Sequence, residues 1–577
     1  MMPLWPRRRW LQCQGVTVAA FAAWPGWLAK GRTGQTGWFD GAPRRPSRPV
    51  THRAHRASYT ECFDPAPWHA LAQQAVEASR TAGARYAEAR LTRIVQHHYT
   101  VDGQFESGGF GWDATERVGI SVRALVDGYW GFAASAVPAP DEALRLAHDA
   151  VTHAKAAAHG PPWTVELGTI PVATGTWVTP HRIDPFAISI EEKLDYIAYW
   201  RRCAVQAGVG LVKNGMPSEL RFARQERVVA TSEGALFTQT LLESGGLLLC
   251  GDNTTSTQVD GIELAGAGWE RLLDAKIPDQ FPRIRAELAA MAAIPAKPSV
   301  IGQYTLVCDG ATMAALLEAT LGVATQLDRA LGYEADAGGT SFITDPLAMV
   351  GHAQVASPVV TVTANRSAPQ ELATVQWDDE GVTPQPFTLI KDGVLVDFQT
   401  TREQAAWLAP YYHAHGRPVV SHGCAAAEDA HGITQQMLPN LALLPSPAAI
   451  RLDDLVADVQ EGILIEGGTV SQVDAQARTG LLLGGRMRQI RNGRAGAWLM
   501  GGAVLFRSQD LWKHITAVGN ASTQGGISRT QYTGVEAMFE NLLVHGKGQP
   551  PQFTSHSVRA VAATIPKQSL IDPLRKA

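Results

Sequence analysis

The chain has 577 residues, of which 45% are hydrophobic and 18% are charged. These values are typical of a folded globular protein, and the length favours two or more domains. The first 58 residues hold ten of the 50 Lys and Arg residues but only one of the 54 acidic residues, so the rest carries a formal charge of −13. The acidic charge of residues 59–577 argues against binding to the phosphate backbone of nucleic acids.

The basic N-terminal segment contains three consecutive arginines that begin at Arg7, followed by an apolar run at 16–23 with small residues suited to cleavage. It resembles a twin-arginine export signal. We therefore expect residues 1–29 to be a signal and residues 30–58, rich in Arg, Pro and Gly, to be a linker. This predicts an exported or periplasmic protein. The alternatives are that untranslated sequence has been included, or that the protein is cytoplasmic.

The next part of the chain predicts alternating helices and strands, which we assign to an N-terminal α+β domain over residues 59–296. Asp127-Gly128 between two apolar runs indicates a hairpin, because type I′ turns need two positive φ angles. Ser189 with Glu192 indicates a capping box at a helix start. The predicted helices are 68–80, 142–158 and 190–203, and the predicted strands include 86–95, 221–231 and 235–243.

A proline-bearing stretch at 294–302 marks the predicted domain boundary. After it we expect a helix at 312–330 and then mostly strands and turns, with hairpins at Asp392-Gly393 and Asn492-Gly493. No uncharged apolar stretch of about 18 residues occurs beyond the N-terminus, which argues against an integral membrane span. The predicted fold class is α+β, with a strand-rich second domain over residues 300–577.

The segment Leu316 to Arg329 reads LLEATLGVATQLDR. It resembles the signature helix of the TldD/PmbA metallopeptidase family, whose pattern is roughly L-x-H-E-x-x-G-H-x-x-E-x-D-R. The resemblance implies that Glu318, Ala319 and Val323 occupy the family positions of the first histidine, the catalytic glutamate and the second histidine.

Further blocks in the same order carry the resemblance from about residue 86 to about residue 562. They are GISVRALVDGYWGFAAS (119–135), IDPFAISIEEKL (183–194), GYEADAGGTSF (332–342), DDEGVTPQPFTLIKDGVLVDF (378–398) and GILIEGGTVSQVD (462–474). The ordered set implies a TldD/PmbA-type fold, in which the strand-rich C-terminal domain carries the motif.

A catalytic zinc site needs three protein ligands, an open position for water and a nearby base. Val323 cannot bind a metal and Ala319 cannot accept a proton, which leaves Glu318 as the one weak candidate on the helix. None of the 17 histidines is followed by glutamate, so no H-E-x-x-H pattern exists. His545, in HGKGQPPQ, resembles the position of a third ligand, a cysteine in the family. We expect no metal or other cofactor in this chain.

The two histidine positions of the family pattern are five residues apart, whereas regular α-helical faces align at three or four. The motif helix therefore needs a local bulge to bring both positions to one face.

Other candidate groups have ordinary explanations. His413, His415 and His422 lie near Cys424, but the Gly and Pro residues around them favour a surface loop. The acidic run 378–380 fits no EF-hand spacing, and we expect a solvated or capping turn or a structural role specific to the family. The six cysteines include no C-x-x-C pair, which favours buried thiols.

The resemblance implies metal-dependent proteolysis of peptides or unstructured polypeptides by a heteromer. In such a heteromer a TldD-type subunit carries zinc and a TldE/PmbA-type subunit does not. We expect this chain to be the non-catalytic partner of an intact-motif TldD-type subunit. Two alternatives stay open: an active metallopeptidase whose rearranged metal site uses Glu318, His545 and a loop histidine, and a stand-alone peptide-binding protein.

Overall fold

The computed structural model describes residues 63–101, 110–158, 165–211, 218–252, 257–293, 296–336, 338–427, 429–529 and 555–571. The predicted signal, the predicted linker and His545 lie outside these residues. Within them, no helix is long and apolar enough to cross a membrane.

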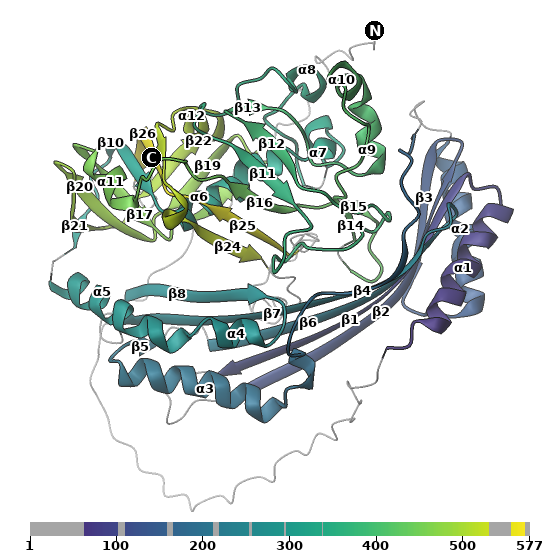
Figure 1. Ribbon diagram of the computed structural model, residues 1–577, viewed down its shortest axis with the longest axis horizontal. Coiled ribbons are helices and arrows are strands. Elements are labelled where there is room, and N and C mark those ends of the chain that lie inside the picture. Colours follow the sequence, from purple (N-terminus) through teal and green to yellow (C-terminus); the bar gives the residue numbers. More distant parts are fainter. Residues whose placement is uncertain are drawn as a thin grey trace, which may run out of the picture. The chain divides into compact units, whose positions relative to one another are not determined.

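The first part of the described chain forms an eight-stranded sheet in the order β3-β2-β1-β6-β7-β4, with β5 and β8 also paired to β7. Its central strands are long and curved (Figure 1). The strands are β1 (Tyr86–Val101), β2 (Phe110–Val126), β3 (Tyr129–Ser135), β4 (Thr174–Val178), β5 (Gly210–Leu211), β6 (Ser218–Thr231), β7 (Leu236–Asp252) and β8 (Thr257–Gly266).

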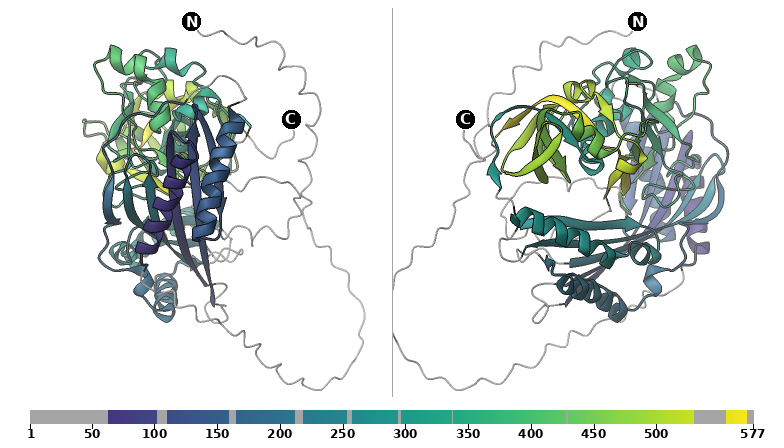
Figure 2. Two further views of the ribbon diagram at one scale, coloured as in Figure 1. Left: turned by 90° about the vertical axis from the view of Figure 1, so that its right-hand side faces the viewer. Right: turned by 60° about the vertical axis from the view of Figure 1, so that its left-hand side comes forward.

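Helices cover this sheet at its two ends, because apolar side chains line the strands there. The helices α1 (Ala66–Thr81) and α2 (Pro140–Ala157) lie side by side over one end (Figure 2). There they bury residues such as Leu91, Val122 and Leu146. At the other end a second core gathers aromatic and aliphatic side chains of the sheet and of three further helices, α3 (Ile190–Gln206), α4 (Glu270–Asp274) and α5 (Phe281–Ala293).

The predicted hairpin and the predicted start of α3 at Ser189 are confirmed. The β2–β3 hairpin turns at Asp127 and Gly128, with φ angles of 50° and 85° as a type I′ turn requires. The Ser189 hydroxyl accepts a hydrogen bond from the Glu192 backbone N–H at 3.1 Å, which caps α3. The three predicted helices correspond to α1, α2 and α3.

Helix α2 packs so closely on β3 that glycine is required at position 131. A Cβ at Gly131 would lie 2.0 Å from the Ala150 carbonyl oxygen and 2.4 Å from the Ala154 nitrogen. We expect Gly131→Ala to lower the free energy of unfolding by about 1–3 kcal/mol, because α2 must move away from the sheet. Urea unfolding measures this. Gly496→Ala is the control, since its Cβ would meet nothing nearer than 3.7 Å, and equal losses in both variants would contradict the packing argument.

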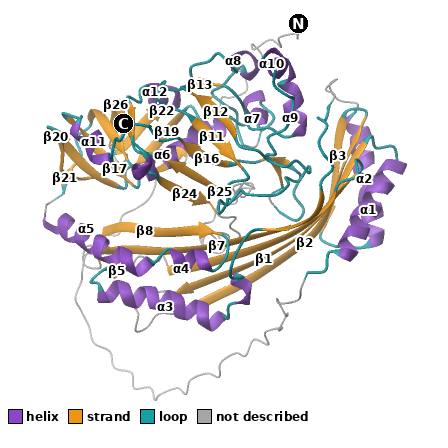
Figure 3. Cartoon of the chain, viewed as in Figure 1, coloured by secondary structure: helices purple, strands orange, loops and turns teal. Residues whose placement is uncertain are grey.

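The second part of the described chain is rich in strands, with short helices (Figure 3). A ten-stranded sheet has the order β18-β19-β22-β26-β10-β17-β20-β21-β9, with β23 paired to β26. Its strands are β9 (Lys297–Pro298), β10 (Gly302–Cys308), β17 (Glu461–Glu466), β18 (Thr469–Val473), β19 (Thr479–Leu483), β20 (Arg486–Arg491), β21 (Arg494–Met500), β22 (Ala503–Arg507), β23 (Ala517–Val518) and β26 (Ala563–Ile571).

A six-stranded sheet and a two-stranded sheet complete this part. The six-stranded sheet contains β11 (Val362–Asn365), β12 (Phe387–Lys391), β13 (Val394–Leu395), β16 (Asn440–Leu443), β24 (Gly525–Arg529) and β25 (His556–Ala560), and the small sheet pairs β14 (Ala425–Ala426) with β15 (Gln435–Gln436). The helices named below are α6 (Gly310–Leu317), η3 (Glu318–Gly322), α7 (Leu327–Leu331), α9 (Arg402–Trp407) and α10 (Ala409–Ala414). The α+β class is thus confirmed.

Both predicted hairpin turns of this part are confirmed, and the predicted helix at 312–330 is helical apart from a break at Thr325 and Gln326, after which α7 begins at Leu327. Asp392-Gly393 and Asn492-Gly493 all have positive φ angles. The motif helix ends before Gln326, whose backbone is extended with a ψ of 122°. Gln326 forms a parallel bridge with Gln399 instead. Contact with a distant segment therefore overrides the local helical pattern.

The acidic run 378–380 is buried, which corrects the expectation of a solvated turn. Asp379 accepts hydrogen bonds from Arg90 of β1 at 2.9 Å and from Arg227 of β6 at 2.5 Å. Glu380 pairs with Arg123 of β2 at 2.8 Å. All five side chains are less than 10% exposed. The acidic run therefore has a structural role, which was the other expectation for it. It attaches the loop that contains residues 378–380 to the first sheet.

Candidate functional site

The motif segment begins as α6 and continues as a π-helical turn. The Asp309 carboxylate accepts a hydrogen bond from the Thr312 backbone N–H at 2.8 Å and caps α6. The chain then widens into η3, which spans Glu318–Gly322 with π geometry. A π turn adds one residue to a helical turn, so positions 318 and 323 come to lie one turn apart. This confirms the expected local bulge.

The three positions that the resemblance assigns to metal chemistry share the accessible side of this segment. Every residue from Thr312 to Asp328 is buried except Glu318, Ala319 and Val323, which are partly exposed. A Cβ at Gly322 would lie 2.7 Å from a methyl carbon of Leu441, so that residue faces the core. The accessible side of η3 therefore carries a carboxylate, a methyl group and an isopropyl group.

Buried polar groups fix the other side of η3. The Gln399 amide donates hydrogen bonds to the Gly322 carbonyl oxygen at 2.6 Å and to the Thr325 hydroxyl at 2.9 Å. The Trp512 indole N–H donates to the Thr320 hydroxyl at 2.8 Å. The first of these bonds gives a partner to a backbone carbonyl at the end of the wider turn, and the other two attach side chains of the segment to the core.

The Asp328-Arg329 pair of the motif connects the segment to its surroundings. The Arg329 guanidinium donates to the Thr340 carbonyl oxygen at 3.1 Å and to Glu334 at 3.4 Å. Burial, with the charge of Glu334, raises the pKa of Asp328 to about 7. These residues belong to the framework of the segment rather than to its accessible side.

Glu318 is paired with a residue that the sequence analysis missed. His556 Nε2 of β25 lies 2.7 Å from Glu318 Oε1, and the side chains of His556 and Glu318 are 6% and 14% exposed. Because a carboxylate can only accept, the imidazole Nε2–H is the donor. The two residues lie 238 positions apart, and no local pattern around His556 indicates the pair.

The residues on this side do not fit a catalytic zinc site. Glu318 and His556 are ligand types, but Val323 offers no donor atom and Ala319 offers no base. Across the described ranges, no group of three or more His, Cys, Asp or Glu side chains could hold a metal ion. His545, the remaining predicted candidate, lies outside those ranges.

The histidines near Cys424 do not gather at one point, and the expected surface loop is wrong for His422. His413 and His415 are exposed at the end of α10. His422 is buried, lies flat against Phe387 with ring centroids 3.9 Å apart, and pairs with Asp397 at 3.1 Å. Burial raises the pKa of the Cys424 thiol to about 12, so this thiol is an inert core group.

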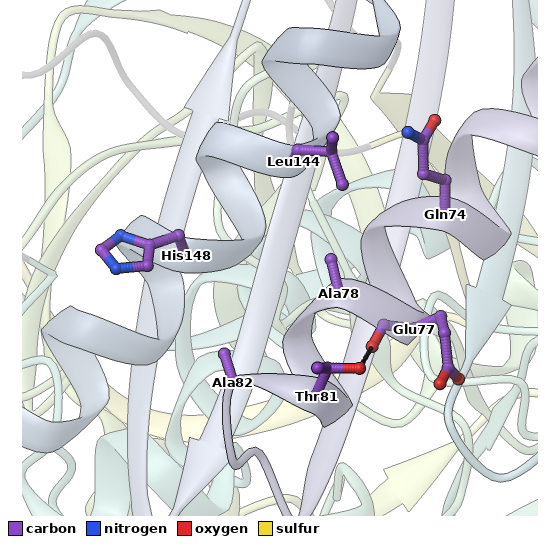
Figure 4. A pocket seen from close by; sticks show the side chains of 7 residues that line it. All are labelled: Gln74, Glu77, Ala78, Thr81, Ala82, Leu144 and His148. Atoms are coloured by element: carbon purple, nitrogen blue, oxygen red, sulfur yellow. Dashed lines mark hydrogen bonds between the residues drawn. The ribbon is translucent and has the colours of Figure 1, made fainter.

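A groove of about 490 Å³ lies between α1 and α2, on elements separate from the motif (Figure 4). It is lined by Gln74, Glu77, Ala78, Thr81, Ala82, Leu144 and His148. Its one imidazole, on His148, is not paired with a nucleophile in the lining. The groove offers apolar surface rather than chemistry.

Comparisons with known proteins agree with the resemblance found in the sequence. The family described as PmbA/TldA metallopeptidase C-terminal domain matches residues 301–546. A metalloprotease of Methanocaldococcus jannaschii is 22% identical over 395 residues, which cover 67% of this chain and 79% of that protein.

Solved structures of similar proteins show the same fold. TldE from Thermococcus kodakarensis is 14% identical with a TM-score of 0.61, over 86% of this chain and 99% of its own. A putative modulator of a DNA gyrase from Thermotoga maritima is 13% identical with a TM-score of 0.59, over 87% of this chain and 100% of its own. These matches support the assignment of the chain to the TldD/PmbA family, whose C-terminal domain model covers residues 301–546.

Proposed function

We propose that this chain is a non-catalytic member of its family. It would serve as the partner of an intact-motif TldD-type subunit in a metal-dependent peptidase that acts on peptides or unstructured polypeptides. The observation that carries the proposal is the accessible side of η3, where Glu318, Ala319 and Val323 occupy the positions that the resemblance assigns to two ligands and a base. The segment has a π geometry that would present such groups on one side, but its side chains there are not the ligands and base of the family pattern.

Peptide hydrolysis by zinc requires a metal-bound water and a base that removes its proton. The alkyl groups of Ala319 and Val323 supply neither function. In the proposed assembly the intact subunit supplies the zinc, the water and the base. This chain contributes part of the wall of the site and part of the surface that binds the substrate. Its folded framework is suited to that role.

One observation favours a second candidate function, an active enzyme with a rearranged metal site. Glu318 and His556 already bring two ligand-type side chains within 2.7 Å of each other. A third ligand is needed for a catalytic zinc, and the described residues do not provide it. The partner role is therefore the better-supported proposal. A stand-alone peptide-binding protein would be distinguished by purification without any family partner.

The twin-arginine-like segment supports a further proposal, that the assembly is exported. That route carries folded proteins, so a bound partner could travel with this chain. Conversion of the three arginines from Arg7 to lysine would then retain both proteins in the cytoplasm. Finding the unmodified protein only in the cytoplasm would refute export.

The partner role is tested by co-expression with an intact-motif relative from the same genome. We expect the two chains to co-purify, and hydrolysis of an unstructured polypeptide to need both chains and to be abolished by a chelator. Alanine at a motif histidine of the relative should remove activity. Glu318→Gln in this chain should change activity less than about twofold, because the amide keeps an acceptor for His556 but is a poor metal ligand.

Two results would contradict the proposal. Chelator-sensitive hydrolysis by this chain alone, abolished by Glu318→Gln, would establish the rearranged metal site. Full hydrolysis by the relative alone, unchanged by addition of this chain, would remove the partner role.

A further inference from the structure

We infer that the Glu318–His556 pair is a metal-free cross-link: it joins η3 to β25 on the side where an intact relative would hold its metal, and so maintains the π turn without an ion. The cross-link is a property of the isolated chain and does not depend on the partner role. The residues on η3 do not fit the metal site that the family implies, because Val323 offers no ligand atom and Ala319 offers no base.

The pair connects two elements that already pack together. Helix α6 approaches the β24–β25 pair so closely that a Cβ at Gly310 would lie 2.3 Å from the Gly525 nitrogen and 2.5 Å from the Ala560 oxygen. Strand β25 is held on both edges, by antiparallel pairing with β24 and parallel pairing with β16. His556, the first residue of β25, therefore projects from a supported strand, and Glu318, the first residue of η3, meets it.

A π turn needs such support because it is rarely stable by itself. On the buried side, Gln399 and Trp512 bond to the turn at 2.6 and 2.8 Å. On the accessible side, the bond from His556 to Glu318 at 2.7 Å has the short length of a charge-assisted hydrogen bond. Both side chains are more than four-fifths buried, so solvent weakens this bond less than it weakens an exposed ion pair.

Metal coordination and this hydrogen bond accomplish the same connection by different chemistry. A metal would link ligand side chains of the motif helix to a residue of another segment through the ion. Here a carboxylate at position 318 is bonded directly by the imidazole of β25, and Val323 takes no part. The consequence is that chelation should leave the local structure of this chain unchanged.

Hydrogen exchange of the full-length chain tests the inference, read by mass spectrometry on peptides that cover η3 and β25. The variants are Glu318→Ala, His556→Ala, their combination and Glu318→Gln. His98→Ala is the matched control, because it breaks a second histidine–carboxylate pair, His98 to Glu219 at 2.8 Å, in the first sheet.

We expect each alanine variant to accelerate exchange in η3 and β25 about tenfold or more, the range of a hydrogen bond to a charged group. The double variant should exchange no faster than the single ones, because both remove the same bond. Glu318→Gln should recover part of the protection, and His98→Ala should leave both elements unchanged. EDTA should have no effect on exchange in the unmodified chain.

Additive effects of the two alanine substitutions, or unchanged exchange in both, would overturn the cross-link. Faster exchange of the unmodified chain in EDTA would show that a metal holds the segment, and would overturn it independently of any variant. Hydrogen exchange is measured on this chain alone and does not depend on peptidase activity. Failure of the proposed partner role would therefore not change the exchange results expected for the cross-link.

Discussion

Replacing Asp379 by alanine is expected to lower the free energy of unfolding by about 3–5 kcal/mol, the cost of removing one partner from a buried ion pair. Asp379 is 2% exposed and accepts hydrogen bonds from Arg90 and Arg227, which come from two strands of the first sheet. Without the carboxylate, both guanidinium groups stay buried beside each other. Urea or thermal unfolding of the full chain measures the loss.

An exposed ion pair provides the control for this substitution. Asp149→Ala removes a partner of Arg145 on the surface of α2, where the side chains are 34% and 53% exposed. Such a pair contributes little to stability, because solvent screens the two charges. Comparable losses in the two variants would show that the loop 378–382 does not depend on its arginine contacts.

The same carboxylate predicts an acid-dependent loss of stability. Burial by itself would raise the pKa of Asp379, but the charges of Arg227 and Arg90 outweigh burial and lower the pKa below its ordinary value. A lowered folded-state pKa contributes stability that is present above the unfolded value of about 3.9 and is lost as the pH falls through the folded value. Asp379→Asn should therefore show a shallower loss of stability in acid than the unmodified chain.

The sequence predicts those features of this fold that depend on neighbouring residues. Asp127-Gly128 and Asn492-Gly493 identify hairpins because positive φ angles are a local requirement of their turns. The π turn could be anticipated because the family spacing of five residues conflicts with helical geometry. Each of these inferences uses only a few consecutive residues.

Features that depend on distant partners were missed for a physical reason. The arginines that bury the acidic run stand at 90, 123 and 227, and no pattern in the chain joins them to position 379. Gln326 leaves the helix because Gln399 pairs with its backbone. His556 lies 238 residues from Glu318, outside any motif window. Such pairs become visible only when the sheets are assembled.

The largest change in metal binding is expected from the variant with Glu318→His, Ala319→Glu and Val323→His. We expect it to bind about one zinc per chain with a Kd near or below about 1 µM, or about 8 kcal/mol, whereas the unmodified chain should retain no stoichiometric zinc after dialysis against a mild chelator. The π turn already places positions 318 and 323 on the accessible side of η3. Metal analysis and zinc titration measure the difference.

The structure indicates His556 as the third ligand of this variant. Its Nε2 atom is 2.7 Å from the Glu318 carboxylate, so an imidazole at position 318 would place two nitrogens near one point. Adding His556→Ala to the triple variant should weaken zinc binding at least about 100-fold, because two ligands and water cannot replace a three-ligand site. His545→Ala in the same background is the comparison. Loss of zinc with His545→Ala but not with His556→Ala would assign the third ligand to the HGKGQPPQ segment. A folded triple variant without zinc would contradict the assignment of 318, 319 and 323 to the metal-binding positions.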